Sequence, residues 1–263
     1  MTELVQTEDA GHVRHIVLNR PEKRNAFNAE LIAALADAVR ETAAAPDVHV
    51  VVLRGNGPLF SSGVDLKELA GQLGAGGGLA QLRTFRTAWL DVANALEEMA
   101  KPVVCQIQGA CLGGALETAL ACDLRVMAED AVAGLPETRI GLIPDVGGSS
   151  RLPQVVGLGR AKELIMTGAL IGAERAEAIG LVNRIAPAAD LEAATQTLVD
   201  ELLVCAPIAV GLAKRVIDAS ARPALSTTLE LEIALQTVCA ATEDFATGAR
   251  AFAAKQQPLY KGR

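Results

Sequence analysis

The sequence predicts an α/β protein in which a buried sheet is covered by helices. Over the first two thirds of the chain, β-branched apolar runs of strand length alternate with apolar patterns of helical period. After residue 187 the strand patterns stop and only helical patterns follow. The 263 residues are 51% hydrophobic and 21% charged, which is the composition of a globular chain with a substantial core.

The alternating part begins with a strand pattern at residues 12–19, HVRHIVLN, and a buried-strand pattern at 48–55, VHVVVLRG. Between them, Asn28 can cap a helix whose apolar residues recur at helical spacing through AELIAALADAVRETAAA. The later segments with strand patterns are 103–109, 124–128 and 131–136, with a glycine-opened helix after the first. Strands interleaved with helices indicate a layered α/β architecture.

The last third contains four helical patterns, with Pro207 and Pro223 at the joints. These patterns cover residues 188–204, 207–220, 224–240 and 242–256. We therefore expect an α/β core over residues 1–187 and a helical C-terminal region over residues 188–263.

Charge and residue usage exclude several classes of protein. The net charge of −7 argues against general nucleic-acid binding, although a local basic pocket for one phosphorylated cofactor is compatible with it. The five cysteines form no CxxC pair, and the three histidines show no ligand spacing, so we expect reduced, mostly buried thiols and no metal site. The acidic N-terminus does not resemble a secretory signal, and the uncharged stretches are too short to span a membrane. A cytoplasmic protein is expected.

The segment CLGGALETALACD, residues 111–123, has the strongest chemical signal. Gly113 and Gly114 open a helix, where backbone N–H groups have no intrahelical acceptor and face the positive end of the helix dipole. Glycines there let a ligand approach the backbone, as in an oxyanion hole. Close helix–strand packing explains the same glycines, and the motif alone does not separate the two interpretations.

Glu117 favours the functional interpretation. It is the only charged residue between Pro102 and Ala121. Burial of a lone carboxyl raises its pKa, which suits a general acid or base, whereas a glutamate on a solvated stripe of the helix would have no such role. Without further information, Glu137 is expected to be an ordinary loop or N-cap residue, and Asp145 an ordinary turn or helix-cap residue.

Several segments, in this order, resemble the crotonase (enoyl-CoA hydratase/isomerase) superfamily over nearly the whole chain. The segments are NRPEKRNAFN (19–28), FSSGVDL (60–66), QGACLGGALETALACD (108–123), GLPETRIGLIPDVGGSSRLP (134–153), IGLVNRI (179–185) and AFAAKQQ (251–257). The resemblance implies a crotonase-like spiral of ββα units and a C-terminal helical trimerisation region. It also implies a homotrimer or dimer of trimers that acts on an acyl-CoA thioester, with CoA as part of the substrate and no separate cofactor.

The same resemblance assigns roles to individual positions. Ser62 and Gly114 match the two backbone donors of the oxyanion hole, and Glu117 and Glu137 match the two catalytic glutamates. The other positions implied to bind substrate are Arg24, Ala26, Gly63, Val64, Asp65, Leu66, Gly113, Pro136, Asp145, Phe252 and Lys255.

The pair of glutamates favours an enoyl-CoA hydratase, which adds water across the 2,3 double bond. Asp145 keeps an enoyl-CoA or dienoyl-CoA isomerase as the alternative, because a carboxylate at this position resembles dienoyl-CoA isomerases. A non-catalytic acyl-CoA-binding member is a second alternative. Phe85 and Trp89 lie four residues apart on one helical face, which we expect to be core.

Overall fold

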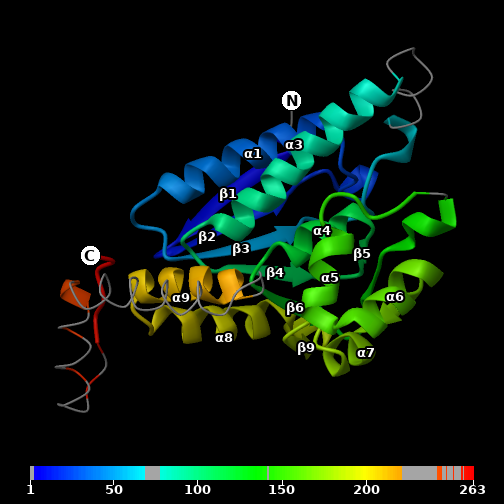
Figure 1. Ribbon diagram of the computed structural model, residues 1–263. Helices are drawn as coiled ribbons and strands as arrows, with labels where there is room; N and C mark the ends of the chain where they lie inside the picture. The colour runs from blue at the N-terminus through cyan, green and yellow to red at the C-terminus, as the bar shows by residue number, and fades with distance from the viewer. Residues whose placement is uncertain are drawn as a thin grey trace.

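The computed structural model describes residues 3–68, 78–140 and 142–220, together with 242–244, 247, 251, 256 and 258–263. Its main sheet has six strands in the order β1-β2-β3-β4-β6-β9, with β1 antiparallel to β2 and every other neighbouring pair parallel (Figure 1). The strands are β1 (Val5–Ala10), β2 (Val13–Leu18), β3 (Val50–Gly55), β4 (Val103–Ile107), β6 (Leu124–Ala128) and β9 (Arg184–Ala186).

A smaller sheet runs beside the first. It consists of β5 (Ala110–Leu112), β7 (Val132–Gly134) and β8 (Leu170–Gly172), in that order. The chain passes from β4 to β5, through helix α4 (Gly114–Leu120), and then to β6 and β7. Since β6 pairs with β4 and β7 pairs with β5, one ββα turn adds a strand to each sheet. The expected ββα spiral is thus observed.

Helices cover both faces of the main sheet. Helix α1 (Ala29–Ala44) packs on β1, β2 and α3 (Gly78–Glu98), whereas α8 (Leu191–Leu203) packs on β3, β4, β6 and β9 from the other side (Figure 1). The remaining helices are α5 (Gly148–Val156), α6 (Leu158–Thr167), α7 (Ala173–Ala178), α9 (Pro207–Ser220) and the 3₁₀ turns η1 (Pro21–Lys23), η2 (Pro136–Ile140) and η3 (Ala188–Asp190).

Local sequence explains where α1 begins. The Asn28 side chain accepts a hydrogen bond from the Leu31 amide at 2.9 Å, as the sequence predicts for an N-cap. The buried residues of α1 recur at helical spacing and form one apolar face: Leu31, Ile32, Leu35, Ala38, Val39 and Thr42.

The five predicted strands and the helical patterns at 188–204 and 207–220 are confirmed. Strand β1 was not predicted, because its residues 6–9 are polar and mostly exposed on an edge strand. The short strands β5, β8 and β9 were also not predicted. The helical pattern at 224–240 lies outside the described residues, as does most of the one at 242–256, and the domain division at residue 187 stays a prediction.

A buried ion pair attaches α9 to the core. Lys214 is 7% exposed, and its ammonium donates to Asp123 Oδ2 at 2.8 Å and to the Leu96 carbonyl at 3.0 Å. Asp123 Oδ2 also accepts from the Val103 amide at 2.7 Å. The pair therefore joins helix α9 to strand β4 and to the segment that ends α4.

Lys214→Met should lower the free energy of unfolding by about 2–4 kcal/mol, because it leaves the Asp123 carboxylate without its cation. Lys162→Met, at an exposed position of α6, is the control and should change little. Urea unfolding followed by circular dichroism measures both. Equal stabilities would contradict an anchoring role for the pair.

Candidate active site

The candidate site lies where the loop after β3 runs beside β4 and β5. The Phe60 amide donates to the Gln108 carbonyl at 2.8 Å, and the Ser61 amide donates to the Ala110 carbonyl at 3.1 Å. The Leu112 amide donates back to the Ser61 carbonyl at 3.3 Å. This short parallel ladder brings the segment around Ser62 alongside the turn that begins α4.

Glycine is required where the two segments come closest. Gly63 has a φ of +87°, and a Cβ there would overlap the Leu112 carbonyl oxygen and lie 3.6 Å from the Gly114 nitrogen. Gly114 is the first residue of α4, so its N–H has no acceptor within the helix. The glycines predicted for a hole thus occupy positions that allow close approach of backbone.

The two candidate hole donors differ in their present partners. Within the described part of the chain, no acceptor is recorded for the Gly114 N–H. The Ser62 N–H donates to the Arg24 carbonyl at 3.1 Å. A ligand oxygen can therefore use the Ser62 N–H only by sharing it with Arg24 or by displacing that carbonyl.

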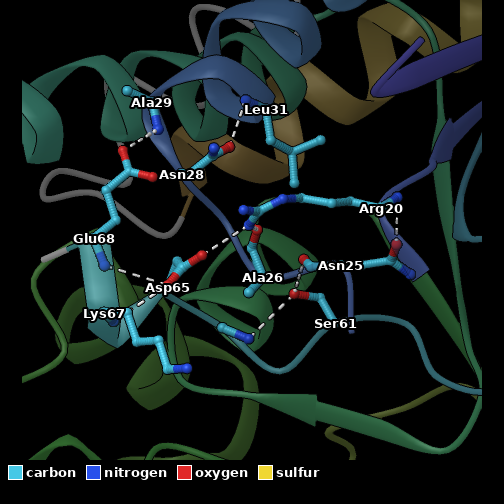
Figure 2. Close-up of polar contacts among 11 residues, drawn as sticks. Arg20, Asn25, Ala26, Asn28, Ala29, Leu31, Ser61, Asp65, Lys67 and Glu68 are labelled. Carbon is cyan, nitrogen blue, oxygen red and sulfur yellow. Dashed lines mark hydrogen bonds and ion pairs between the residues drawn. The ribbon is translucent and has the colours of Figure 1, made fainter. Parts of the chain in front are cut away.

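Asn25 is bonded to the loop that contains Ser62 and holds its path. It is fully buried with a φ of 49°, a left-handed conformation that asparagine tolerates better than most residues. Its side-chain amide donates to the carbonyls of Asn56, Leu59 and Phe60 at 2.9–3.1 Å. The backbone carbonyl of Asn25 accepts a hydrogen bond from the Ser61 hydroxyl at 2.7 Å (Figure 2). Sequence reasoning missed Asn25, although it lies within the NRPEKRNAFN segment.

The predicted CoA-binding residues gather beside this loop. The Arg20 guanidinium donates to Asp65 Oδ2 and to the Ala26 carbonyl, each at 2.9 Å, and holds the two segments together (Figure 2). Burial raises the pKa of Asp65, but the hydrogen bond and charge of Arg20, together with hydrogen bonds from the Lys67 and Glu68 amides, outweigh burial and lower that pKa below its usual value. The Asp65 carboxylate is thus already engaged within the protein, while Arg24 and Leu66 are exposed.

Glu117 is a buried carboxyl held at the start of a helix. It is 2% exposed, and its Oε2 accepts hydrogen bonds from the Val146 and Gly148 amides at 2.7 Å each. Gly148 is the first residue of α5, so the carboxyl meets the positive end of that helix. Burial raises the pKa of Glu117 to about 7; the two amides oppose this increase, and nearby Glu137 adds to it. This environment suits a general base at neutral pH.

Glu137 is bonded differently, because the hydrogen bond that lowers its pKa comes from its own backbone amide. Its Oε2 is buried without a hydrogen-bond partner among the described residues. Burial, together with the charge of Asp145, raises its pKa, which favours the protonated acid. Gly113 allows the approach of this side chain, since a Cβ there would lie 2.9 Å from Glu137 Oε1. An unsatisfied buried carboxyl oxygen indicates a partner supplied by a ligand or water.

Both glutamates line one small cavity of about 140 Å³. Its other described lining residues are Val64, Phe85, Arg86, Trp89, Gly114, Leu142, Ile143, Asp145 and Val146. Arg86 Nε donates to the Asp145 carbonyl at 2.8 Å and lies 3.7 Å from its carboxylate. Arg86, Ile143 and Asp145 also line a larger hollow of about 670 Å³.

The cavity refines one expectation about α3. Trp89 is 2% exposed and belongs to the core, as predicted. It also lines the cavity beside Phe85, with which it makes an edge-to-face contact at 5.9 Å between ring centroids. The aromatic face of α3 therefore serves both the core and the site.

The structure also bears on the predictions about cysteine burial. Cys105, Cys111 and Cys122 are buried as predicted, but Cys205 is exposed. Within the described ranges no cluster of three His, Cys, Asp or Glu could hold a metal ion, and none of the described helices is long and apolar enough to cross a membrane. Phe252 and Lys255, predicted to reach a neighbour's CoA pocket, lie outside the described residues.

Comparison with known proteins identifies the class to which this fold and site belong. The family model for enoyl-CoA hydratase/isomerase matches residues 8–263. The 2,3-dehydroadipyl-CoA hydratase of Escherichia coli (strain K12) is 35% identical over 264 residues, covering 100% of both chains. An enoyl-CoA isomerase/hydratase of Mycosarcoma maydis is 34% identical over 260 residues, which cover 95% of this chain and 93% of that protein.

A solved structure of a protein named as an enoyl-CoA hydratase has the same fold as this chain. The crystal structure of an enoyl-CoA hydratase from Bacillus anthracis superposes with a TM-score of 0.93 at 35% identity, covering 99% of this chain and 100% of that one. The chain belongs to the enoyl-CoA hydratase/isomerase family and has the crotonase fold.

Glu117→Gln should change how stability depends on pH. Folding raises the pKa of Glu117, so its ionisation above the unfolded pKa of about 4.3 destabilises the folded protein. Between pH 5 and pH 8 the ionisation of Glu117 should lower the free energy of unfolding of the wild type by up to about 3 kcal/mol. The glutamine keeps an oxygen for the Val146 and Gly148 amides but carries no charge, so the variant should gain relative stability as pH rises. Urea titrations at several pH values measure the difference, and parallel curves would rule out a desolvated Glu117.

Proposed function

We propose that this protein is an enoyl-CoA hydratase that adds water to a trans-2-enoyl-CoA. The observation that supports this most strongly is the pair Glu117 and Glu137, two carboxyls with raised pKa values lining one cavity beside the start of α4. Relatives named as hydratases match the chain over its full length. Both acids and the hole glycine, Gly114, are present, which argues against a non-catalytic acyl-CoA-binding protein.

The proposed first step depends on the backbone. The thioester oxygen accepts hydrogen bonds from the Gly114 and Ser62 N–H groups, the latter shared with or released by the Arg24 carbonyl. These donors stabilise negative charge on that oxygen, so C3 of the conjugated acyl group becomes electrophilic. Loss of one such donor typically lowers the rate about 100- to 1,000-fold.

The two glutamates then move the protons. Ionised Glu117, held through Oε2 by two amides, removes a proton from water through its other oxygen while the water oxygen bonds to C3. The π electrons move onto the thioester oxygen and form an enolate. When that enolate collapses, Glu137 donates its proton to C2, and the product is a 3-hydroxyacyl-CoA. Proton exchange with solvent restores both residues.

The size of the cavity supports a short acyl group. Its volume of about 140 Å³ is well below the roughly 300–1,000 Å³ of pockets that hold drug-sized ligands. We also propose, from the resemblance to the family, that the enzyme needs no separate cofactor and assembles as a homotrimer or dimer of trimers.

Loss of the conjugated-thioester absorbance of crotonyl-CoA tests the proposal, with a longer trans-2-enoyl-CoA run in parallel. Glu137→Gln should lower kcat by roughly 100- to 10,000-fold because it removes the proton donor, while CoA-thioester binding should change little. Glu174→Gln, at an exposed position of α7, is the control. Full activity of Glu137→Gln would refute the assignment of Glu137.

Isomerisation is the second candidate, because Asp145 lines the same cavity as both glutamates. In a hydratase Asp145 touches no reacting atom, so Asp145→Asn should change the hydration rate less than about threefold. In a dienoyl-CoA isomerase the same variant should lose roughly 100-fold or more, since a proton-transfer group is removed. Assays with 2-enoyl, 3-enoyl and dienoyl substrates separate the two; a gain of conjugated absorbance from the 3-enoyl compound alone would favour isomerase.

A further inference from the structure

Trp89, the only tryptophan in the chain, packs directly on the first residue of α4. A Cβ on Gly114 would overlap the indole ring, lying 2.6 Å from Cζ2 and 2.8 Å from Cζ3. The ring therefore covers one face of Gly114 and leaves no room for a side chain there. The position of the Gly114 backbone depends on where this ring lies.

A hydrogen-bond chain fixes the ring against the same helical turn. Trp89 Nε1 donates to Thr118 Oγ1 at 2.9 Å, and Thr118 Oγ1 donates to the Gly114 carbonyl at 2.9 Å. Thr118 is fully buried, so both bonds are shielded from water. A hydroxyl can accept from one group while donating to another, and here it links the indole to the carbonyl of the residue that carries the candidate donor.

The indole ring also packs on Phe27, whose backbone is bonded to the segment that follows Ser62. Trp89 stacks on Phe27 with 4.5 Å between ring centroids. The Phe27 amide donates to the Gly63 carbonyl at 2.8 Å, and its carbonyl accepts from the Asp65 amide at 2.9 Å. Phe27 is fully buried, so its backbone clamps the residues that directly follow Ser62.

We propose that Trp89, fixed by Thr118, is a positioning residue that sets the distance between the Ser62 and Gly114 N–H groups. This inference rests on the proposed function, since those groups form the oxyanion hole only in that case. An oxyanion hole works through donors held in place before the reaction, and a displacement of about 1 Å can cost 100-fold in rate. The contacts of Trp89 reach both segments at once.

Thr118→Val tests the proposal. The substitution keeps the shape of the side chain but removes both hydrogen bonds, so the indole N–H loses its acceptor. It should lower kcat roughly 10- to 100-fold with KM changed less than about threefold, because donor alignment matters most in the transition state. Thr118→Ser restores the hydroxyl and should recover most of kcat.

Thr195→Val is the matched control. Thr195 is also a buried helical threonine, and its hydroxyl donates to the Leu191 carbonyl at 2.8 Å, four residues earlier in α8. It should lose comparable stability while keeping kcat. If Thr118→Val and Thr195→Val keep the same kcat, Trp89 and Thr118 are core residues only and the proposal fails.

A spectroscopic measurement separates this proposal from the proposed function. A bound, strongly conjugated acyl-CoA that resists hydration should absorb at longer wavelength than in solution, because hydrogen bonds polarise its thioester carbonyl. Thr118→Val should reduce that red shift, and an unchanged shift would overturn the proposal. If the wild type binds the thioester and shifts its absorbance but hydrates no enoyl-CoA, the proposed hydratase activity is refuted. The red shift in Thr118→Val then still supports or overturns the positioning role of Trp89.

Trp89→Phe provides a second variant in case Thr118→Val does not fold. It keeps an aromatic ring against Phe27 and Gly114 but removes the indole N–H, so it should show the same loss of kcat and of red shift. Wild-type activity and an unchanged red shift in this variant would contradict the proposal. Because Trp89 is the only tryptophan, wild-type fluorescence should also change when an acyl-CoA binds.

Discussion

The close approach of two backbone segments, residues 60–63 and 110–114, is the constraint on which the site depends. The segments come from different turns of the spiral, and the short ladder between them leaves no space for a side chain at Gly63. The buried network around Asn25 fixes one segment, and helix α4 fixes the other. Main-chain amides placed by such packing cannot reorient freely. Donors that are already fixed in place are what stabilise a charge as it develops in the reaction.

The same region places two carboxyls in contrasting environments. Glu117 meets two amides and the start of α5, whereas Glu137 has an oxygen with no described partner. Both are desolvated; two amides of another segment oppose this at Glu117, whereas at Glu137 the opposing hydrogen bond comes from its own backbone amide. Two glutamates of identical chemistry thus meet different surroundings, and their roles as base and acid belong to the proposed function.

Sequence patterns were most informative where one residue's environment is set by its neighbours along the chain. The isolation of Glu117 within an apolar helix predicted its burial, and the β-branched runs predicted the central strands. Glu137 and Asp145 lie in a loop, so only the family resemblance indicated a role. Asn25 and Trp89 act through contacts with residues distant in sequence, which local periodicity does not encode, and the polar face of β1 concealed an edge strand.

Arg86, Ile143 and Asp145 line both the small cavity and the larger hollow, and so form a wall common to the two. None of the three contributes a backbone donor to the hole, and the proposed hydratase uses none of their side chains. Substitutions at these three residues would therefore alter which acyl groups fit, while the residues that carry out the proposed reaction stay unchanged. Such a separation gives the family a simple evolutionary route to new substrates, in which inherited chemistry is kept and only the boundary of the acyl site is remodelled.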